Sequence, residues 1–424
     1  MWRPDRRTDA TTGLAEFVVL MAMMTALAAM SIDMLLPALP VIGSALGVTR
    51  ANDNQLIISL LFLGFAFGQV FYGPLSDSTG RKPGVYVGLG LFIAGSLLAL
   101  VADRFSTLLI GRFLQGAGAA GPRTITMALV RDRFEGRSMA RVMSLITTVF
   151  ILVPVVAPAF GQVVLSVSGW RTIFGVYLTT ALIACAWFAL RQEETLPPDR
   201  RLPFTAGRMA GAVADVLGNR PAVGYTIAAG TVFGPFLGYL NSAQQILQEQ
   251  YGLGTRFPAY FATLAIALGA ASFANARLVM RYGMRHLSVW ALRAVCGVSI
   301  VFLGVAYAGS GHPPLPALMA YLIVSFFCIG LLFGNLNAMA MQPLGRAAGT
   351  GAAVVGALST FISLGLGALI GQSYNGTVLP LIGGFAVLSV LAMLAMRWAE
   401  AGRAVPDARL TVDGAPSESA ADDT

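Results

Sequence analysis

The chain has 424 residues, of which 56% are hydrophobic and only 11% are charged, whereas roughly a quarter of the residues of a soluble protein are charged. Together with a mean hydropathy of +0.72, this composition excludes a soluble globular domain and predicts a membrane protein. The net charge of +8 does not indicate a nucleic-acid-binding protein, because the arginines lie in short loops between apolar runs.

Twelve apolar runs are each long enough to cross a bilayer as a helix, which takes about twenty mostly apolar residues. Barrel strands would instead alternate in hydrophobicity over about ten residues, so the run lengths favour an all-α membrane protein with twelve transmembrane helices. The predicted spans lie near 14–38, 54–74, 84–102, 106–129, 140–166, 170–190, 222–248, 257–279, 287–308, 315–338, 348–372 and 378–398.

The first span contains a carboxylate. Asp33 lies in an apolar stretch, 14–39, where the only other charge is that of Glu16 at the edge. A carboxylate in hydrocarbon costs several kcal/mol, so such groups usually face a cavity and serve a function. A helix rise of about 1.5 Å per residue places Asp33 in the outer half of the bilayer, where a water-filled vestibule is the alternative environment. We predict that Asp33 binds a proton.

The turn after the second span, residues 73–83, reads GPLSDSTGRKP. Gly73 permits close approach of backbones. Asp77 is expected to face a helix N-terminus or an arginine, since either would favour its charged form. The alternative is an ordinary basic turn that only determines topology.

The fourth span contains two arginines. Arg112 is expected to function in transport, although it could instead satisfy backbone carbonyls between helices. Arg123 could likewise function there or extend to the membrane interface. The glycines between them, such as Gly116 and Gly118, are typical of tight helix packing. Arg293, one turn into the ninth span, is expected to extend to the interface.

A Pro-rich, charged segment separates the spans into two sets of six, and the basic turn after the second span is weakly echoed after the eighth. Two such repeats are typical of a carrier whose halves rock around a central site. The predicted parts are an N-terminal six-helix bundle, a cytoplasmic linker, a C-terminal six-helix bundle and a disordered cytoplasmic tail, at 1–190, 191–221, 222–398 and 399–424.

The loop charges predict the orientation. Nearly all Lys and Arg residues of the loops fall on the side of the N-terminus, which the positive-inside rule makes cytoplasmic, together with the C-terminus. The exceptions are Arg50, Arg104, Arg171 and Arg256.

The outer end of the seventh span is unusually polar. Asn241, Gln244 and Gln245 could line a substrate pathway. The simpler interpretation is an exposed helix end that extends into water.

Other chemistry is not indicated. The three cysteines are far apart within apolar spans, and the two histidines lie in loops, so no metal site is predicted. We find no nucleophile with a base, as a membrane enzyme would need, and no soluble domain of the size that a receptor would need. Without a GxxxxGK[ST] loop, the energy source should be an ion gradient, with no cofactor. Exchange measurements in liposomes would separate a carrier from a channel.

The turn at 73–83 resembles the signature of the major facilitator superfamily, and the resemblance extends over the chain up to about Arg397. Further strings are similar to the intramembrane arginine motif of that superfamily and to its Bcr/CflA branch of drug:proton antiporters. These strings are GRFLQGAG (111–118), DMLLPALP (33–40), ETLPPDRR (194–201), NAMA (337–340) and AGT (348–350).

The resemblance implies a monomer in the bacterial inner membrane. It would export drugs or other small amphiphilic molecules in exchange for protons by alternating access. The alternative is proton-coupled transport of a natural metabolite, such as an amino acid or a sugar-like solute, with drug export incidental.

The resemblance also implies roles for particular residues. Asp33 would bind a proton or a cationic drug in exchange, and Arg112 would lie near their path. A cytoplasmic latch holding the outward-facing state would consist of Asp77 and Arg81 with Gly73 and Gly80. In the fifth span, an antiporter motif would include Pro154, Pro158 and Gly161, although Ala157 and Gln162 stand where that motif has glycines.

Overall fold

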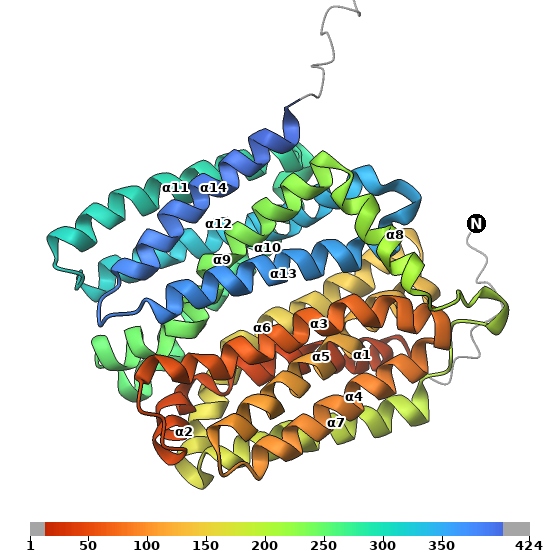
Figure 1. Cartoon of the computed structure of the whole chain (residues 1–424), viewed down its shortest axis with the longest axis horizontal. Helices are drawn as coiled ribbons and strands as arrows, with labels where there is room; N and C mark the ends of the chain where they lie inside the picture. Colours follow the sequence, from red (N-terminus) through yellow and green to blue (C-terminus); the bar gives the residue numbers. More distant parts are fainter. Residues whose placement is uncertain (1–12, 402–424) are drawn as a thin grey trace, which may run out of the picture.

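The computed structural model describes residues 13–401, with side chains at all of these positions except 206, 208 and 345–350. The part of the predicted tail (399–424) beyond residue 401 therefore lies outside the described residues. Helices dominate the described chain (Figure 1).

The first half of the chain begins with a broken helix. The segment η1 (Leu36–Ala38) follows α1, and η2 (Ala51–Gln55) precedes α3. Pro37 and Pro40 lie at the break, where a proline can occupy a first helical turn because its missing N–H is not needed there. The helices are α1 (Leu14–Asp33), α2 (Leu39–Ala45), α3 (Leu56–Thr79), α4 (Arg81–Leu100), α5 (Phe105–Arg133), α6 (Gly136–Ser168) and α7 (Trp170–Arg191).

The second half follows a linker that contains η3 (Pro198–Arg200) and the helix α8 (Ala206–Leu217). Its first long helix continues into a π-helical segment, η4 (Gln245–Gln250), and η5 (Gly254–Arg256) leads into the next helix. A further short segment, η6 (Gln342–Ala347), precedes α13. The long helices are α9 (Arg220–Gln244), α10 (Phe257–Tyr282), α11 (Met284–Ala308), α12 (Leu315–Met341), α13 (Ala348–Gln372) and α14 (Leu379–Glu400).

Eleven helical stretches among the described residues are long and apolar enough to cross a membrane. The fourth predicted span is α5, which has 29 residues but is interrupted in its apolar character by Arg112, Gln115 and Arg123. It packs against α3 and α4 inside the first half. Its length and central position make it the twelfth long helix, so the predicted all-α architecture with two bundles is confirmed.

Small residues bring α3, α4 and α5 into backbone contact. A Cβ atom added at Gly64 would collide with the carbonyl of Phe113, and one added at Gly116 would collide with that of Leu61. A Cβ at Gly118 would meet α4 in the same way. Close approach of this kind allows the van der Waals packing that holds membrane helices together, as predicted for Gly116 and Gly118.

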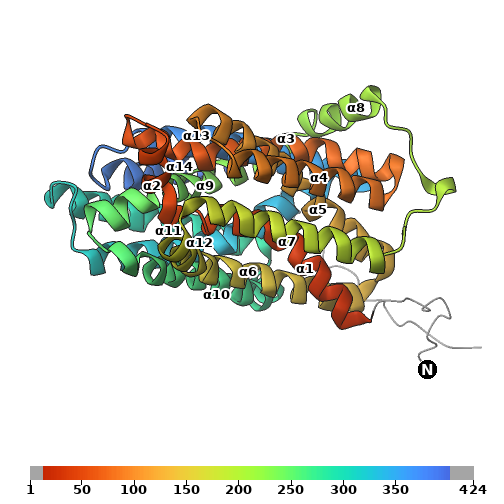
Figure 2. The same ribbon diagram turned by 90° about the horizontal axis from the view of Figure 1, so that it is seen from below.

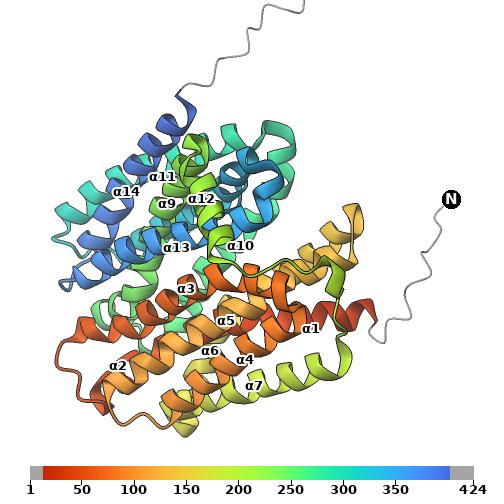
Figure 3. The ribbon, with the colours of Figure 1, turned by 45° about the vertical axis from the view of Figure 1, so that its right-hand side comes forward.

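The two halves lie side by side, with α1–α7 on one side and α9–α14 on the other (Figures 1 and 3). The main contacts between them join α3 to α13 and α6 to α10. The linker and α8 lie at one end of the molecule, here called the linker end, and α2 lies at the opposite end (Figure 2). Sequence analysis did not predict α8, which packs against α9 and α13.

Candidate functional site

Asp33 is the last residue of α1, directly before the break. Its side chain is buried, with 5% relative exposure, and it has no hydrogen bond within residues 13–401. Two tyrosines lie within electrostatic reach, Tyr177 on α7 and Tyr239 on α9. Asp33 therefore faces both halves of the chain, since η1 also contacts α9.

The hydroxyl of Tyr239 is buried and, among the described residues, has no hydrogen-bond partner. The ring is held by Phe261 and Phe326, with centroid separations of 6.0 and 5.0 Å. A buried polar group without a partner costs about 1–3 kcal/mol. Asp33 and Tyr239 are thus two unsatisfied groups from opposite halves, in a position to receive a proton, water or a ligand.

Arg112 is fully buried, and each of its three side-chain nitrogens donates a hydrogen bond. Its Nη2 donates to the carbonyl of Ser31 at 2.8 Å and its Nε to that of Ile57 at 3.0 Å. Its Nη1 donates to Oε1 of Gln115 at 2.7 Å, and the amide of Gln115 donates to Ser96 Oγ at 2.8 Å. Arg112 therefore joins α3 to the last turn of α1, where its acceptor Ser31 lies two residues before Asp33. This geometry corresponds to the alternative interpretation, in which Arg112 satisfies backbone carbonyls between helices.

Arg123 has no such partners. Its guanidinium lies 5.5 Å from the ring centroid of Phe65 on α3 and 4.9 Å from that of Phe150 on α6. Across the described chain it has neither a hydrogen bond nor a carboxylate partner. The helices α3 and α6 make the main contacts with the second half, so Arg123 lies on the side of the first half that faces the second. Both rings belong to middle turns, so the guanidinium stays in the interior.

The turn between α3 and α4 carries a charged cluster. Arg81 Nη1 donates to Asp77 Oδ1 at 2.6 Å and to Ser76 Oγ at 2.9 Å, and Arg81 Nε donates to Asp132 Oδ2 at 2.9 Å. The carboxylate of Glu194 accepts the backbone N–H groups of Arg81 and of the following residue at 2.8 and 2.9 Å. Glu194 thereby neutralises the positive N-terminus of α4.

Gly80 is required in this turn for two reasons. Its φ of 106° lies in the left-handed region that favours glycine. A Cβ atom there would also lie 2.6 Å from Oε2 of Glu194. The chain outside the turn adds a further contact, because the N–H of Leu202 donates to the carbonyl of Asp77 at 2.8 Å. The linker is therefore docked on this turn.

The predicted pair Asp77–Arg81 is formed, whereas Asp132 and Glu194 were missed by sequence analysis. The sequence signal that could have identified Asp132 is an acidic residue flanked by Arg131 and Arg133 just after the fourth predicted span. All members of the cluster belong to the first half or the linker. Contact with the second half comes instead from Gly73, where an added Cβ would lie 3.6 Å from Ala353 Cβ on α13. The latch role stays a prediction.

The fifth-span residues lie on α6, which runs unbroken through Pro154 and Pro158. Pro158 and Gly161 are buried and Pro154 is half-buried. A Cβ atom at Gly161 would collide with the carbonyl of Met34. This glycine therefore lets α6 pack directly against the break that follows Asp33.

The polar end of α9 is buried. The relative exposures of Asn241, Gln244 and Gln245 are 3%, 3% and 4%, so the interpretation as an exposed helix end is wrong. The physical reason is that η2 and α13 cover this end and supply partners for its amides. Gln244 is the exception, because it donates to Glu249 Oε1 at 3.1 Å within its own half.

The partners form a set of hydrogen bonds between the halves that we call the amide seam. Gln55 Nε2 donates to Gln245 Oε1 at 2.6 Å and to the carbonyl of Gly371 at 2.9 Å. Gln245 Nε2 donates in turn to Asn52 Oδ1 at 2.8 Å. The full set consists of Asn52, Gln55, Ser59, Asn241, Gln245, Gly371, Gln372 and Tyr374. It lies at the end opposite the linker.

Comparison with known proteins gives one family match, to the model described as Major Facilitator Superfamily, over residues 21–372. The chain is 28% identical to an uncharacterized MFS-type transporter, YdgK, of Bacillus subtilis, covering 89% of this chain and 93% of that protein. It is 28% identical to a bicyclomycin resistance protein homolog of Haemophilus influenzae, covering 89% and 94%. It is also 28% identical to the multidrug resistance protein MdtL of Klebsiella pneumoniae, covering 86% and 91%.

Two solved structures share the fold. One is a bacterial homolog of the human lysosomal transporter Spinster in an inward-facing, unoccupied conformation, with a TM-score of 0.67 at 14% identity over 91% of this chain and 96% of that one. The other is the xylose transporter XylE from E. coli in a partially occluded inward-open conformation, with a TM-score of 0.67 at 11% identity over 91% and 97%.

Proposed function

Because this chain belongs to the Major Facilitator Superfamily, we propose that it exports drugs or other small amphiphilic molecules across the bacterial inner membrane in exchange for protons. The names of the relatives, which include bicyclomycin resistance and multidrug resistance proteins, agree with the Bcr/CflA branch that the sequence resembles. The proposed carrier is a monomer that works by alternating access. It uses the proton gradient and no cofactor.

The observation that carries the proposal is the position of Asp33. It is a buried carboxylate without a hydrogen bond among the described residues, at a helix break between the two halves. A proton and a substrate group can compete for such a carboxylate, since burial penalises the charge unless something neutralises it. Arg112 supports this role by holding the turn that ends in Asp33, through the carbonyl of Ser31.

Arg123 supports a substrate contact at the same interface. An unpaired cation inside a membrane protein is costly and is retained when it serves transport. Its guanidinium lies over the rings of its two aromatic neighbours, which accept no N–H···O hydrogen bond and so leave its donors for a ligand. We therefore assign to Arg123 the recognition of a carboxylate or another strong acceptor on the exported molecule.

In the proposed cycle, the linker end is cytoplasmic, as the loop charges predict. The amide seam then closes the periplasmic end in the state described here, while the Asp77–Arg81 cluster organises the cytoplasmic turn. Outward opening would require the seam hydrogen bonds to break. Protonation from the periplasm would then reset Asp33.

The proposal is tested with Asp33→Asn, which preserves shape and removes the titratable group. We expect loss of drug resistance in cells and loss of the substrate-driven pH change in proteoliposomes, with normal expression. The matched control is Asp103→Asn, because Asp103 has a side-chain exposure of 91% and should be neutral. A drug panel with and without a protonophore completes the test. Unchanged resistance in Asp33→Asn cells would exclude coupling through this residue.

A further inference from the structure

A pocket lies on the flank of the second half, between the start of α11 and the end of α14. It has a volume of about 360 Å³. The helices α11 and α14 pack mainly against each other and against α9 and α12, away from the interface with the first half. The pocket is therefore separate from Asp33 and Arg123, and a ligand bound there would reach it from the surrounding bilayer.

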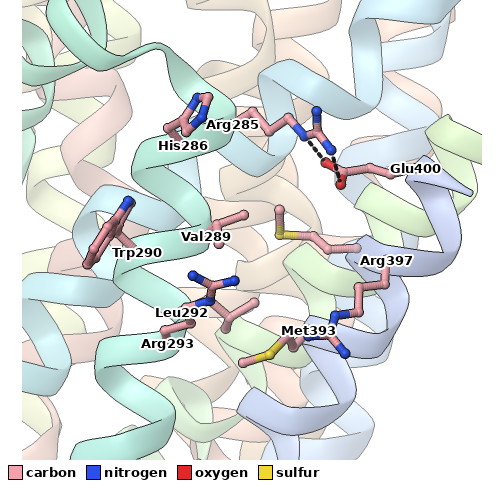
Figure 4. Close-up of a pocket in the computed structure, with 10 residues that line it drawn as sticks. Arg285, His286, Val289, Trp290, Leu292, Arg293, Met393, Arg397 and Glu400 are labelled. Carbon is pink, nitrogen blue, oxygen red and sulfur yellow. Dashed lines mark hydrogen bonds and ion pairs between the residues drawn. The ribbon is translucent and has the colours of Figure 1, made fainter. Parts of the chain in front are cut away.

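The pocket carries unbalanced positive charge. Arg285 and Glu400 neutralise each other through two hydrogen bonds of 2.6 Å. Arg293 on α11 and Arg397 on α14 lie on opposite walls (Figure 4). Both are exposed, and in the part of the chain that the structure describes neither side chain has a hydrogen bond or a carboxylate partner. Two guanidinium groups are thus available to one anion.

Apart from His286, the rest of the pocket is apolar. Val289, Leu292, Met393 and Met396 lie between the charged walls. At its edge, Trp290 is 67% exposed, as is typical of tryptophan at the interface between headgroups and hydrocarbon. Exposed aliphatic side chains continue along both helices away from the charges, at Ile300, Val301 and Leu394. An occupant therefore needs an anionic head and a hydrocarbon tail.

The depth of the pocket agrees with such an occupant. Arg220, at the start of α9, donates to the carbonyl of Trp398 at 2.9 Å, which places the end of α14 at the linker end of the molecule. The loop charges predict that this end is cytoplasmic, where the membrane leaflet is anionic and basic pockets between helices bind lipid headgroups.

We propose that this pocket binds the phosphate of an anionic phospholipid, with Arg293 and Arg397 on the phosphate and an acyl chain along the aliphatic surface of α11 and α14. This site goes beyond the proposed export function and does not depend on it. A single arginine near the surface is worth about a factor of five in affinity for an anionic lipid. Loss of both arginines therefore predicts an affinity roughly 25-fold lower.

The test is native mass spectrometry of the purified full chain, titrated with phosphatidylglycerol or with zwitterionic phosphatidylcholine. We expect the wild-type protein to retain phosphatidylglycerol preferentially, and Arg293→Gln/Arg397→Gln to lose that preference. The matched control is Arg277→Gln/Arg281→Gln. These arginines are also exposed, lie near the end of α10 just before α11, and lie outside the pocket, so this variant loses the same charge but should bind like the wild type.

Several outcomes would overturn the site. Equal retention of the two lipids by the wild-type protein would do so whatever the variants show. An equal loss in the control variant would indicate general attraction to the basic face rather than a pocket. A third arm uses inorganic phosphate alone, and binding as strong as that of phosphatidylglycerol would identify a free-phosphate site instead of a lipid site.

Discussion

Arg112 and Arg123 are two arginines on one helix whose guanidinium groups differ in the hydrogen-bond acceptors around them. They lie about three turns apart on the same face of α5, roughly 16 Å along the helix. Arg112 has carbonyl and amide acceptors for its donors. The Arg123 guanidinium has only aromatic neighbours among the described residues. The first is therefore part of the packing, and the second is available to a ligand.

Replacing Arg123 tests this difference. We expect Arg123→Leu to lower kcat/KM for carboxylate-bearing substrates at least about tenfold, because a hydrogen bond to a charged group contributes roughly 1.5–3 kcal/mol. Arg123→Lys should retain part of the activity, since it keeps the charge but loses the planar donors. Transport is measured in proteoliposomes with carboxylate-bearing and cationic substrates.

The matched control for this experiment is Arg277→Leu, an exposed arginine on α10. It should transport both substrate classes like the wild type. Equal losses for carboxylate-bearing and cationic substrates in Arg123→Leu would contradict a role in recognising the acceptor group.

At the scale of elements, the ends of α3, α9 and α13 are held together by amides rather than by charges. Gly371 makes this approach possible, since a Cβ atom there would collide with the amide of Gln55. Neutral hydrogen bonds contribute only about 1 kcal/mol each. A seam made of them can hold one state and still open during a transport cycle.

Gln55→Leu should shift the population toward the state in which the seam is open. It removes two hydrogen bonds between the halves, which at about 1 kcal/mol each corresponds to roughly 30-fold in the opening equilibrium. The measurement is the labelling rate of Ser59→Cys by a maleimide, in a background where the three native cysteines are replaced by alanine. Ser59 is 7% exposed, so labelling reports opening.

Gln248→Leu provides the control, because Gln248 donates only within its own half, to the carbonyl of Gly254 at 3.4 Å. The cysteine at position 59 should be labelled at the same rate in the Gln248→Leu variant as in the parent protein. An unchanged rate in Gln55→Leu, or an equal increase in Gln248→Leu, would argue against the seam as the element that closes this end.

At the scale of the whole molecule, two helical bundles meet along α3 with α13 and α6 with α10, and the amide seam closes one end. At the linker end, the chain that connects the bundles is docked on the turn between α3 and α4. This arrangement allows the bundles to move relative to each other while the linker stays attached to the first. The helix break after Asp33 contacts α6 of the first half and α9 of the second. A movement of one bundle relative to the other would therefore change the surroundings of Asp33.

Covalent closure of the seam should stop transport. Asn52→Cys/Gln372→Cys, joined by a short methanethiosulfonate cross-linker, is expected to lose export and to regain it after reduction. The native residues are linked by hydrogen bonds of 3.0 and 2.8 Å between the halves, so the reagent can span them. Transport is measured in proteoliposomes before and after reduction.

The control pair is Asp103→Cys/Arg171→Cys, whose native side chains form an exposed ion pair of 3.3 Å within the first half. The same cross-linker there should leave transport intact. Full transport through a cross-linked seam would rule out separation of the bundles at this end as part of the cycle.

Local chemistry in the sequence determined much of this protein. The long apolar runs predicted the helices, because the free energy of inserting a span depends mainly on its own composition. The signature at 73–83 predicted the pairing of Asp77 with Arg81, since both belong to one turn. Asp33 was identified from the sequence because it is a carboxylate within a long apolar stretch.

Only the tertiary structure decided which buried polar groups are satisfied. Arg112 depends on carbonyls of α1 and α3, and Gln245 depends on amides about 190 positions away. The cost of a buried polar atom depends on whether an acceptor or donor from a distant segment reaches it. Local composition does not show which distant segments supply these partners. The amide seam and the unpaired guanidinium of Arg123 could therefore be identified only in the packed structure.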